Sequence, residues 1–235
     1  MRASIVLPTY NERDTLPGIL RRLAAALGSA GIGAEVVVVD DSSPDGTAEA
    51  ALEAARELPL PVTVVRRPGK AGLASAVLEG VRRSQGEAVV VMDSDGSHPP
   101  ELIPRLLGAL EGGADIAVGS RYAPGGGVRG WPLLRRVLSW GATRIARAAF
   151  GLGVRDPVSG FFAARREVLS AGRPLEGIGY KILLEVLVTR PRAQVVEVPY
   201  VFVNRARGRS KLGTGEIYNY VRLVGRLLRR GGRGP

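Results

Sequence analysis

Five short runs of apolar, mostly β-branched residues recur in the first half of the chain, separated by segments with helical apolar spacing. Continuous apolar runs are typical of strands buried on both faces of a parallel sheet. The intervening helices would cover those faces, so this half predicts a doubly wound α/β fold with a mostly parallel central sheet. The expected strands are residues 4–7, 36–39, 62–65, 89–92 and 115–118, and the expected helices are 14–27, 47–56, 72–83 and 99–110.

The second half is less regular. We expect a glycine-rich loop over 123–130, a basic helix over 133–150 and a strand over 195–203. An amphipathic helix is predicted over 215–230, where apolar residues alternate with arginines at helical spacing. The glycine-rich tail 231–235 is predicted to be disordered.

Polar residues cluster where four of the predicted strands end. In doubly wound sheets, ligands bind beyond the carboxyl ends of the strands. Because those ends share one edge of a parallel sheet, we expect the four segments to meet there. They are Thr9-Tyr-Asn-Glu12, Asp40-Asp-Ser-Ser-Pro-Asp-Gly46, Asp93-Ser-Asp95 and Gly119-Ser-Arg-Tyr122.

The pair Asp93 and Asp95 follows a buried strand and predicts a metal site. Two carboxylates at a strand end can share a hard divalent cation, Mg²⁺ or Mn²⁺, with the oxygens of a substrate diphosphate. The alternative is a solvated turn, since Asp, Ser and Gly are common turn residues. The preceding Val-Val-Val-Met run and the neighbouring acidic strand ends favour the metal site.

The other acidic segments suit a nucleotide. Asp41 is expected to bind a ribose or base edge, whereas Asp45 is expected to cap the following helix. Tyr10 offers a ring that could pack on a base, and Glu12 offers a carboxylate that could accept its N–H groups. On its own, this last segment would be an ordinary strand-to-helix turn.

Composition narrows the chemistry. The chain has no cysteine, so disulfides and thiolate chemistry are excluded. It has a single histidine, His98, so a Ser-His-Asp or Cys-His nucleophile is nearly excluded. His98 precedes two prolines, and a local structural role is expected. The formal net charge of +11 points to an anionic partner: nucleic acid, anionic lipid or a phosphorylated substrate.

Together the motifs resemble glycosyltransferase family 2, whose members have the GT-A (Rossmann-like) fold, and most closely its dolichyl-phosphate (polyprenyl-phosphate) mannose synthases. The resemblance covers nearly the whole chain, and the order and spacing of the motifs are more specific than any one of them. Besides the strand-end segments, it rests on Trp131-Pro-Leu-Leu-Arg135 with Ser139, Asp156-Pro-Val-Ser-Gly-Phe161, Gly179-Tyr-Lys181, Glu197-Val-Pro199, Arg205 and Gly208-Arg-Ser-Lys-Leu212.

The resemblance implies two halves: residues 1–122 bind the nucleotide sugar, and residues 123–230 bind the acceptor. Asp93 and Asp95 would bind the metal, with Ser97 beside them as a third ligand. Around the donor, the family pattern places Pro8, Tyr10, Glu12, Val39, Asp41, Asp93, Ser94, Asp95, Arg121, Arg205 and Lys211. The implied catalytic set is Asp95, Arg121, Arg135, Ser139, Arg205 and Lys211, the last four lining the acceptor phosphate.

The implied reaction is transfer of mannose from GDP-mannose to a polyprenyl (dolichyl) phosphate. A phosphate monoester, with a second pKa of about 6, needs no general base, which fits an arginine-rich site. Direct attack would invert the anomeric carbon and give a β-linked product. The same family leaves UDP-glucose as an alternative donor.

No run reaches the roughly 18 apolar residues of a membrane span. We therefore expect a cytoplasmic protein held at the membrane face peripherally, or by an anchoring subunit. The helices predicted at 133–150 and 215–230 could lie on the bilayer, with Trp131 and Trp140 suiting an interface, or could simply pack onto the sheet. A nucleotidyltransferase would want a glycine-rich basic loop after the first strand, which is missing here. Binding to nucleic acid is disfavoured because acidic strand ends would repel a phosphate backbone.

Overall fold

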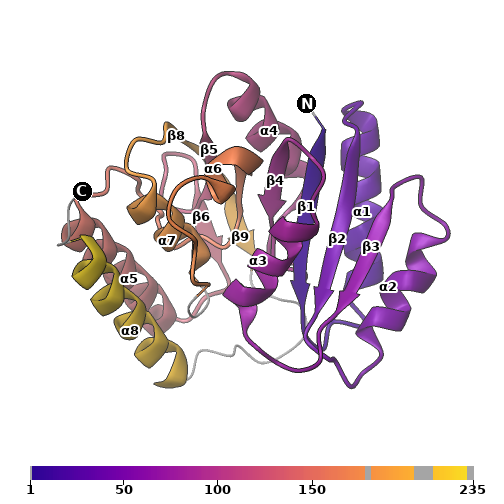
Figure 1. Cartoon of the computed structure of the whole chain (residues 1–235), viewed down its shortest axis with the longest axis horizontal. Coiled ribbons are helices and arrows are strands. Elements are labelled where there is room, and N and C mark those ends of the chain that lie inside the picture. The colour runs from indigo at the N-terminus through magenta and orange to yellow at the C-terminus, as the bar shows by residue number, and fades with distance from the viewer. Residues whose placement is uncertain (1, 178–180, 204–213, 232–235) are drawn as a thin grey trace.

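The computed structural model describes residues 2–177, 181–203 and 214–231. Its centre is a seven-stranded sheet in the order β3-β2-β1-β4-β7-β5-β8 (Figure 1). All strands of this sheet point the same way except β7, which is antiparallel to both β4 and β5. The prediction of a mostly parallel sheet is confirmed. The strands are β1 Ala3–Thr9, β2 Ala34–Asp40, β3 Val62–Arg66, β4 Ala88–Val91, β5 Ile116–Ser120, β7 Phe162–Arg165 and β8 Val195–Pro199.

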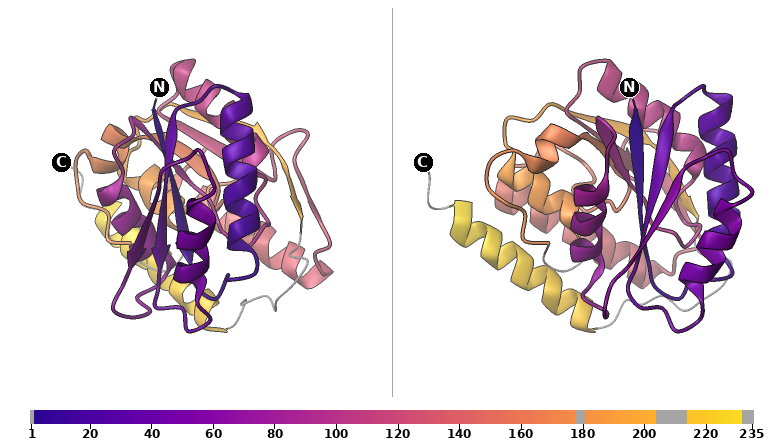
Figure 2. Two further views of the ribbon diagram at one scale, coloured as in Figure 1. Left: turned by 90° about the vertical axis from the view of Figure 1, so that its right-hand side faces the viewer. Right: turned by 45° about the vertical axis from the view of Figure 1, so that its right-hand side comes forward.

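Helices cover both faces of the sheet (Figure 2). The alternation of side chains along β1 explains the division: Ile5 and Leu7 face one core, and Val6 faces the other. The first core packs against α1 Leu16–Ser29, α2 Thr47–Ala55 and α4 Ile103–Glu111. The second packs against α3 Leu73–Arg83, α6 Arg166–Ser170 and α7 Ile182–Thr189.

The predicted helix over 99–110 begins later than expected. A 3₁₀ turn, η1 Pro100–Leu102, comes first, and α4 starts at Ile103 with Pro104 in its first turn. Proline lacks a backbone N–H and is therefore tolerated only where a helix begins.

The predicted strand over 195–203 is two strands in different sheets. It breaks at Tyr200, whose N–H donates to Ser120 and whose carbonyl accepts from Gly127. After the break, β9 Val201–Val203 pairs with β6 Gly127–Arg129 in a separate two-stranded sheet. The glycine-rich segment 123–130 is thus not all loop, because its end forms β6.

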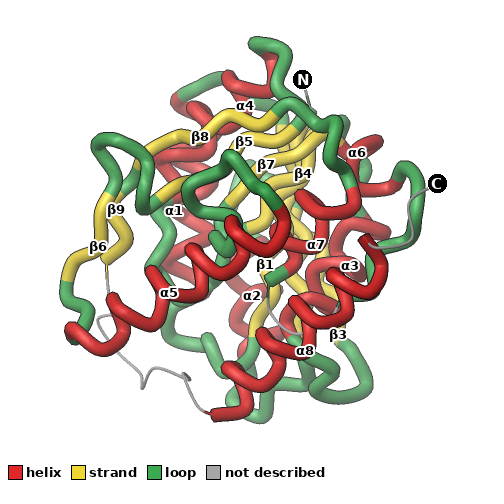
Figure 3. Tube along the Cα trace, turned by 90° about the vertical axis from the view of Figure 1, so that its left-hand side faces the viewer, coloured by secondary structure: helices red, strands yellow, loops and turns green. Residues whose placement is uncertain are grey.

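Two helices, α5 Leu133–Phe150 and α8 Thr214–Gly231, lie side by side at the edge of the molecule farthest from β3 (Figures 1 and 3). Tyr220 of α8 donates its hydroxyl to the carbonyl of Ala142 in α5 at 2.6 Å. Tyr220, Leu223 and Leu227 of α8 are buried, together with Leu184 of α7. Both predicted basic helices are confirmed. Gly231 ends α8, and the remainder of the predicted tail lies outside the described residues.

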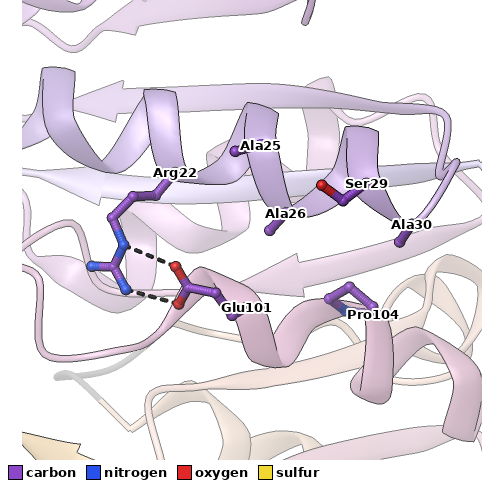
Figure 4. Close-up of a pocket in the computed structure, with 7 residues that line it drawn as sticks. All are labelled: Arg22, Ala25, Ala26, Ser29, Ala30, Glu101 and Pro104. Atoms are coloured by element: carbon purple, nitrogen blue, oxygen red, sulfur yellow. Dashed lines mark hydrogen bonds and ion pairs between the residues drawn. The ribbon is translucent and has the colours of Figure 1, made fainter.

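A shallow groove of about 470 Å³ lies between α1 and α4 (Figure 4). Arg22 and Glu101 close it with two hydrogen bonds of 3.0 and 2.8 Å. None of the polar residues at the strand ends lines this groove. It therefore carries no part of the candidate site.

Candidate active site

The acidic and aromatic segments meet at one edge of the sheet, as predicted. β1 pairs in parallel with β2, which aligns Pro8 with Val39 and Thr9 with Asp40. β1 also pairs in parallel with β4, so Asp93 emerges at the same edge. Because β7 runs the other way, its beginning lies at this edge, and the loop 156–161 that precedes it arrives there too.

The turn from Asp93 to His98 is held by its own hydrogen bonds. Ser94 donates its hydroxyl to the Pro8 carbonyl at 3.0 Å, which ties the turn to β1. The Ser97 N–H donates to Asp95 Oδ1 at 2.9 Å, and the Asp93 N–H donates to His98 Nδ1 at 3.0 Å. These bonds hold the backbone at Asp93 and the carboxylate of Asp95 in place.

The surroundings of His98 fit the local structural role expected for it. It is buried and stacks on Phe161, with ring centres 5.0 Å apart. Burial lowers the pKa of His98, outweighing the opposing effect of Asp93 and Asp95. The imidazole is therefore neutral at physiological pH, and since Nδ1 accepts a hydrogen bond, its proton sits on Nε2.

The turn fits a divalent cation. Asp93, Asp95 and Ser97 offer hard oxygen ligands of the kind Mg²⁺ and Mn²⁺ prefer. The buried hydroxyl oxygen of Ser97 finds no hydrogen-bond partner among the residues that the structure describes. Within residues 2–177, 181–203 and 214–231, no group of three or more His, Cys, Asp or Glu side chains could hold an ion. An ion here would need further oxygens from a bound diphosphate.

Gly160 lies directly against this turn. A Cβ atom at Gly160 would sit 3.3 Å from Asp93 Oδ2 and 3.4 Å from His98 Cε1. These contacts are tighter than ordinary van der Waals distances, so glycine at position 160 leaves room for the carboxylate.

The expected nucleotide-binding residues line the neighbouring strand ends. Asp41 forms an ion pair with Arg67 (Nε to Oδ1, 2.7 Å) and accepts the Gly72 N–H at 3.2 Å. A nucleotide bound by Asp41 would share it with this arginine.

Asp45 lies just before α2, whose N-cap is Gly46 and not Asp45 as predicted. Its carboxylate accepts the N–H of Thr47, the first residue of α2, at 3.0 Å. It also accepts the Arg13 N–H at 3.2 Å. Thr47 in turn accepts the Glu12 N–H at 2.9 Å, which joins the β1 loop to this helix.

Tyr10 is half-buried, and Lys70 lies over its ring with Nζ 4.1 Å from the ring centre. Pro8 and Val39 are buried in the strands, where their backbones rather than their side chains would face a ligand. Arg67 and Lys70 were not among the residues predicted for the site. Their position after β3, at the same edge as Asp41, was the available clue.

Arg121 is buried and bound on one side. Asp156 accepts hydrogen bonds from its backbone N–H (3.0 Å), Nε (2.8 Å) and Nη2 (2.8 Å). Burial alone would lower the pKa of Arg121, but the charge and hydrogen bonds of Asp156 outweigh it and raise the pKa above its ordinary value. The guanidinium is therefore a fixed, permanent positive charge.

Arg135 and Ser139 of α5 lie close to the same region. Arg135 Cζ is 4.3 Å from the Trp131 ring centre, and Arg121 Cζ is 5.5 Å from it. Ser139 accepts the Tyr122 hydroxyl at 2.9 Å, which joins α5 to the segment after β5. The structure thus gathers Arg121, Arg135 and Ser139 around one aromatic cluster.

Trp131 corrects one expectation. It is only 7% exposed and packs on Phe202, with ring centres 5.0 Å apart, so it is not placed at a membrane interface. Trp140, at 54% exposed, remains available for one. Arg205 and Lys211 lie outside the described residues.

Comparison with known proteins identifies the family. Residues 4–173 match the family model for glycosyl transferase family 2. The chain belongs to this family of glycosyltransferases.

Three relatives are similar over most of the chain. A dolichol-phosphate mannosyltransferase of Pyrococcus furiosus is 47% identical over 97% of this chain and 64% of its own length. A polyprenol monophosphomannose synthase of Mycolicibacterium smegmatis is 42% identical over 92% of this chain and 83% of its own. An undecaprenyl-phosphate mannosyltransferase of Micrococcus luteus is 40% identical over 92% and 89%. The chain thus spans less than two thirds of the Pyrococcus protein.

Solved structures support the fold. Mannosyl-3-phosphoglycerate synthase from Rubrobacter xylanophilus matches all of this chain and 78% of its own, with a TM-score of 0.74 and 24% identity. Glucosyl-3-phosphoglycerate synthase from Mycobacterium tuberculosis, solved with Mn²⁺ and UDP, matches all of this chain and 81% of its own, with a TM-score of 0.71 and 24% identity. The GT-A fold implied by the motifs is confirmed.

Proposed function

We propose that this protein transfers mannose from GDP-mannose to a polyprenyl phosphate. The observation that carries the proposal is the turn of Asp93, Asp95 and Ser97, which lies at the sheet edge where β1 and β2 also end. The next residue, His98, packs on Phe202, and Arg135 lies over the same ring. The names of the three relatives, each a mannosyltransferase or mannose synthase acting on a polyprenol phosphate, support this donor sugar and acceptor class.

The donor's nucleotide would lie over the ends of β1 and β2. Tyr10 would pack on the base, Glu12 would accept its N–H groups, and Asp41 would hold the ribose or base edge. Asp93, Asp95 and Ser97 would hold Mg²⁺ or Mn²⁺ beside the diphosphate. Such an ion, when bound, neutralises charge that develops on the leaving diphosphate.

The acceptor's phosphate would be held by Arg135 and Ser139, together with Arg205 and Lys211, while Arg121 would reach the donor's diphosphate or sugar. One phosphate oxygen attacks the anomeric carbon and forms the new C–O bond, while the bond to the diphosphate breaks and GDP leaves with its electron pair. No proton has to be removed from the nucleophile. Attack opposite the leaving group inverts the carbon and gives the β-linked lipid.

The acceptor's hydrocarbon calls for a membrane, and the outer faces of α5 and α8 suit one. Among the described residues, no helix is long and apolar enough to cross a bilayer. We propose peripheral binding at the cytoplasmic face. Large apolar side chains are exposed here next to arginines, an arrangement that favours an anionic lipid surface. They are Leu133, Leu134, Val137, Leu138, Trp140 and Ile145 of α5, and Tyr218, Val221 and Leu228 of α8.

An apolar recess of about 310 Å³ continues this surface toward the site. It is lined by Tyr122, Val128, Arg136, Val137 and Trp140. Tyr122 also hydrogen-bonds Ser139, so the recess adjoins the proposed phosphate site. We place the first isoprene units of the acceptor in this recess.

The test is a sugar-transfer assay with purified polyprenyl phosphates and radiolabelled donors. GDP-mannose should label the lipid with Mg²⁺ or Mn²⁺ present, and EDTA should stop the labelling. If UDP-glucose labels the lipid and GDP-mannose does not, the transferred sugar is glucose and not mannose. Labelling by neither donor, on any polyprenyl phosphate, would overturn the proposal.

A further inference from the structure

Glu197 and the loop before β7 form a connected chain of contacts that ends at Arg121. Glu197 lies on β8, in register with Val118 of β5. Its two carboxylate oxygens accept the backbone N–H groups of Arg155 at 2.9 Å and Asp156 at 3.0 Å. One carboxylate thus holds two consecutive peptide groups and fixes the backbone at Asp156.

Asp156 continues the chain. Its carboxylate is fully buried, and both of its oxygens bind Arg121. The loop is held further along as well, because Ser159 donates its hydroxyl to the Gly119 carbonyl at 2.7 Å. A shift of the backbone at Asp156 would therefore displace the Arg121 guanidinium.

We propose that Glu197 is a positioning residue for Arg121, acting through Asp156. The inference rests on the proposed role of Arg121 in mannosyl transfer. Glu197 holds the Asp156 backbone, and Asp156 fixes the Nε and Nη2 edge of the guanidinium. Nη1 takes no part in these bonds to Asp156. The edge strand β8 thereby orients a charge in the site without touching the substrate.

The variant Glu197→Gln tests this proposal. Its amide keeps one acceptor oxygen but turns an N–H donor toward the second peptide N–H. The matched control is Asp115→Asn, because Asp115 also accepts a backbone N–H, that of Gln194 at 2.8 Å, just before the start of the same strand pair. Each variant replaces a carboxylate that accepts a backbone N–H with an amide of the same size.

Two measurements decide the outcome. The first is hydrogen exchange of the Arg121 Nε–H followed by ¹⁵N NMR, with the resonance assigned by its loss in Arg121→Lys. The second is kcat for mannosyl transfer. In Glu197→Gln, the exchange should become about tenfold faster and kcat should fall about tenfold, as expected for a weakened hydrogen bond. Asp115→Asn should leave both unchanged at a similar melting temperature.

An unchanged exchange rate of the Arg121 Nε–H in Glu197→Gln would overturn the proposal. So would equal changes of the exchange rate and of kcat in the control Asp115→Asn. If Glu197→Gln does not fold, Glu197→Asp gives the same comparison, since it keeps the charge but shortens the reach. The NMR measurement needs no activity. A wild-type protein that transfers no mannose would therefore contradict the proposed function and still leave the coupling of Glu197 to Arg121 decided.

Discussion

The ammonium group of Lys70 lies 4.1 Å from the centre of the Tyr10 ring, so a cation from the loop after β3 covers the aromatic side chain that follows β1. A purine packed on Tyr10 would lie close to this charge.

The first prediction concerns nucleotide affinity at Tyr10 and Lys70. Tyr10→Ala should weaken GDP binding by about 1–3 kcal/mol, the usual range for loss of one stacked base. Lys70→Ala should weaken it by about 1 kcal/mol, whereas Lys70→Arg should retain it. Isothermal titration with GDP and Mn²⁺ measures all three. Full affinity in Tyr10→Ala would place the base elsewhere.

The second prediction concerns the metal. Asp95→Asn keeps the volume of the side chain but removes a charged oxygen ligand, and we expect Mn²⁺ binding in the presence of GDP to fall at least about tenfold, with loss of transfer. Electron paramagnetic resonance of free Mn²⁺ gives the affinity. Asp115→Asn, which changes an aspartate away from the turn, serves as the control and should bind normally. Equal affinities would remove Asp95 from the metal site.

The third prediction uses the contact between Gly160 and Asp93. Gly160→Ala would place a methyl group 3.3 Å from Asp93 Oδ2 and displace the carboxylate. We expect the Mn²⁺ concentration needed for half-maximal activity to rise about tenfold, since a shifted ligand weakens the ion's coordination. Gly153→Ala, where an added Cβ meets nothing within 4 Å, is the matched control. An unchanged Mn²⁺ requirement in Gly160→Ala would show that the carboxylate is not constrained from this side.

The fourth prediction concerns the membrane. Trp131→Phe leaves Trp140 as the only tryptophan, and its emission should shift to the blue when anionic vesicles are added and return with salt. Adding Val137→Glu should weaken vesicle binding about tenfold or more, because a charge would enter the apolar face. Leu52→Glu on α2, also at an exposed apolar position, should not. Vesicle binding that is equally weakened by both changes would point away from α5.

Much of the fold could be predicted because each early strand is a continuous β-branched run. The exception, β7, reads Phe-Ala-Ala-Arg over residues 162–165 and lacks that pattern. It is a strand because β4 and β5 pair with it on both sides, which is a tertiary cause invisible in local sequence. The break at Tyr200 has the same origin, since its backbone bonds to two different segments.

The site could be predicted in part for similar reasons. Asp41, Asp93 and Arg121 follow strand ends, and the topology brings them to one edge. Partners from distant segments could not be foreseen: Asp156 is 35 residues from Arg121, and Arg67 reaches Asp41 from the end of the neighbouring strand β3. The sequence left open whether Trp131 lies at an interface or packs inside, because its position before a basic helix says nothing about Phe202, which packs on it.

The reversed direction of β7 has a practical outcome for engineering. The chain enters β7 from the substrate side and leaves it at Arg165 on the opposite side, where α6 begins. A label, affinity tag or tether inserted near Ser170 would thus lie on the side of the sheet edge opposite the candidate active site. An immobilised enzyme attached there would keep the candidate active site and the outer faces of α5 and α8 accessible.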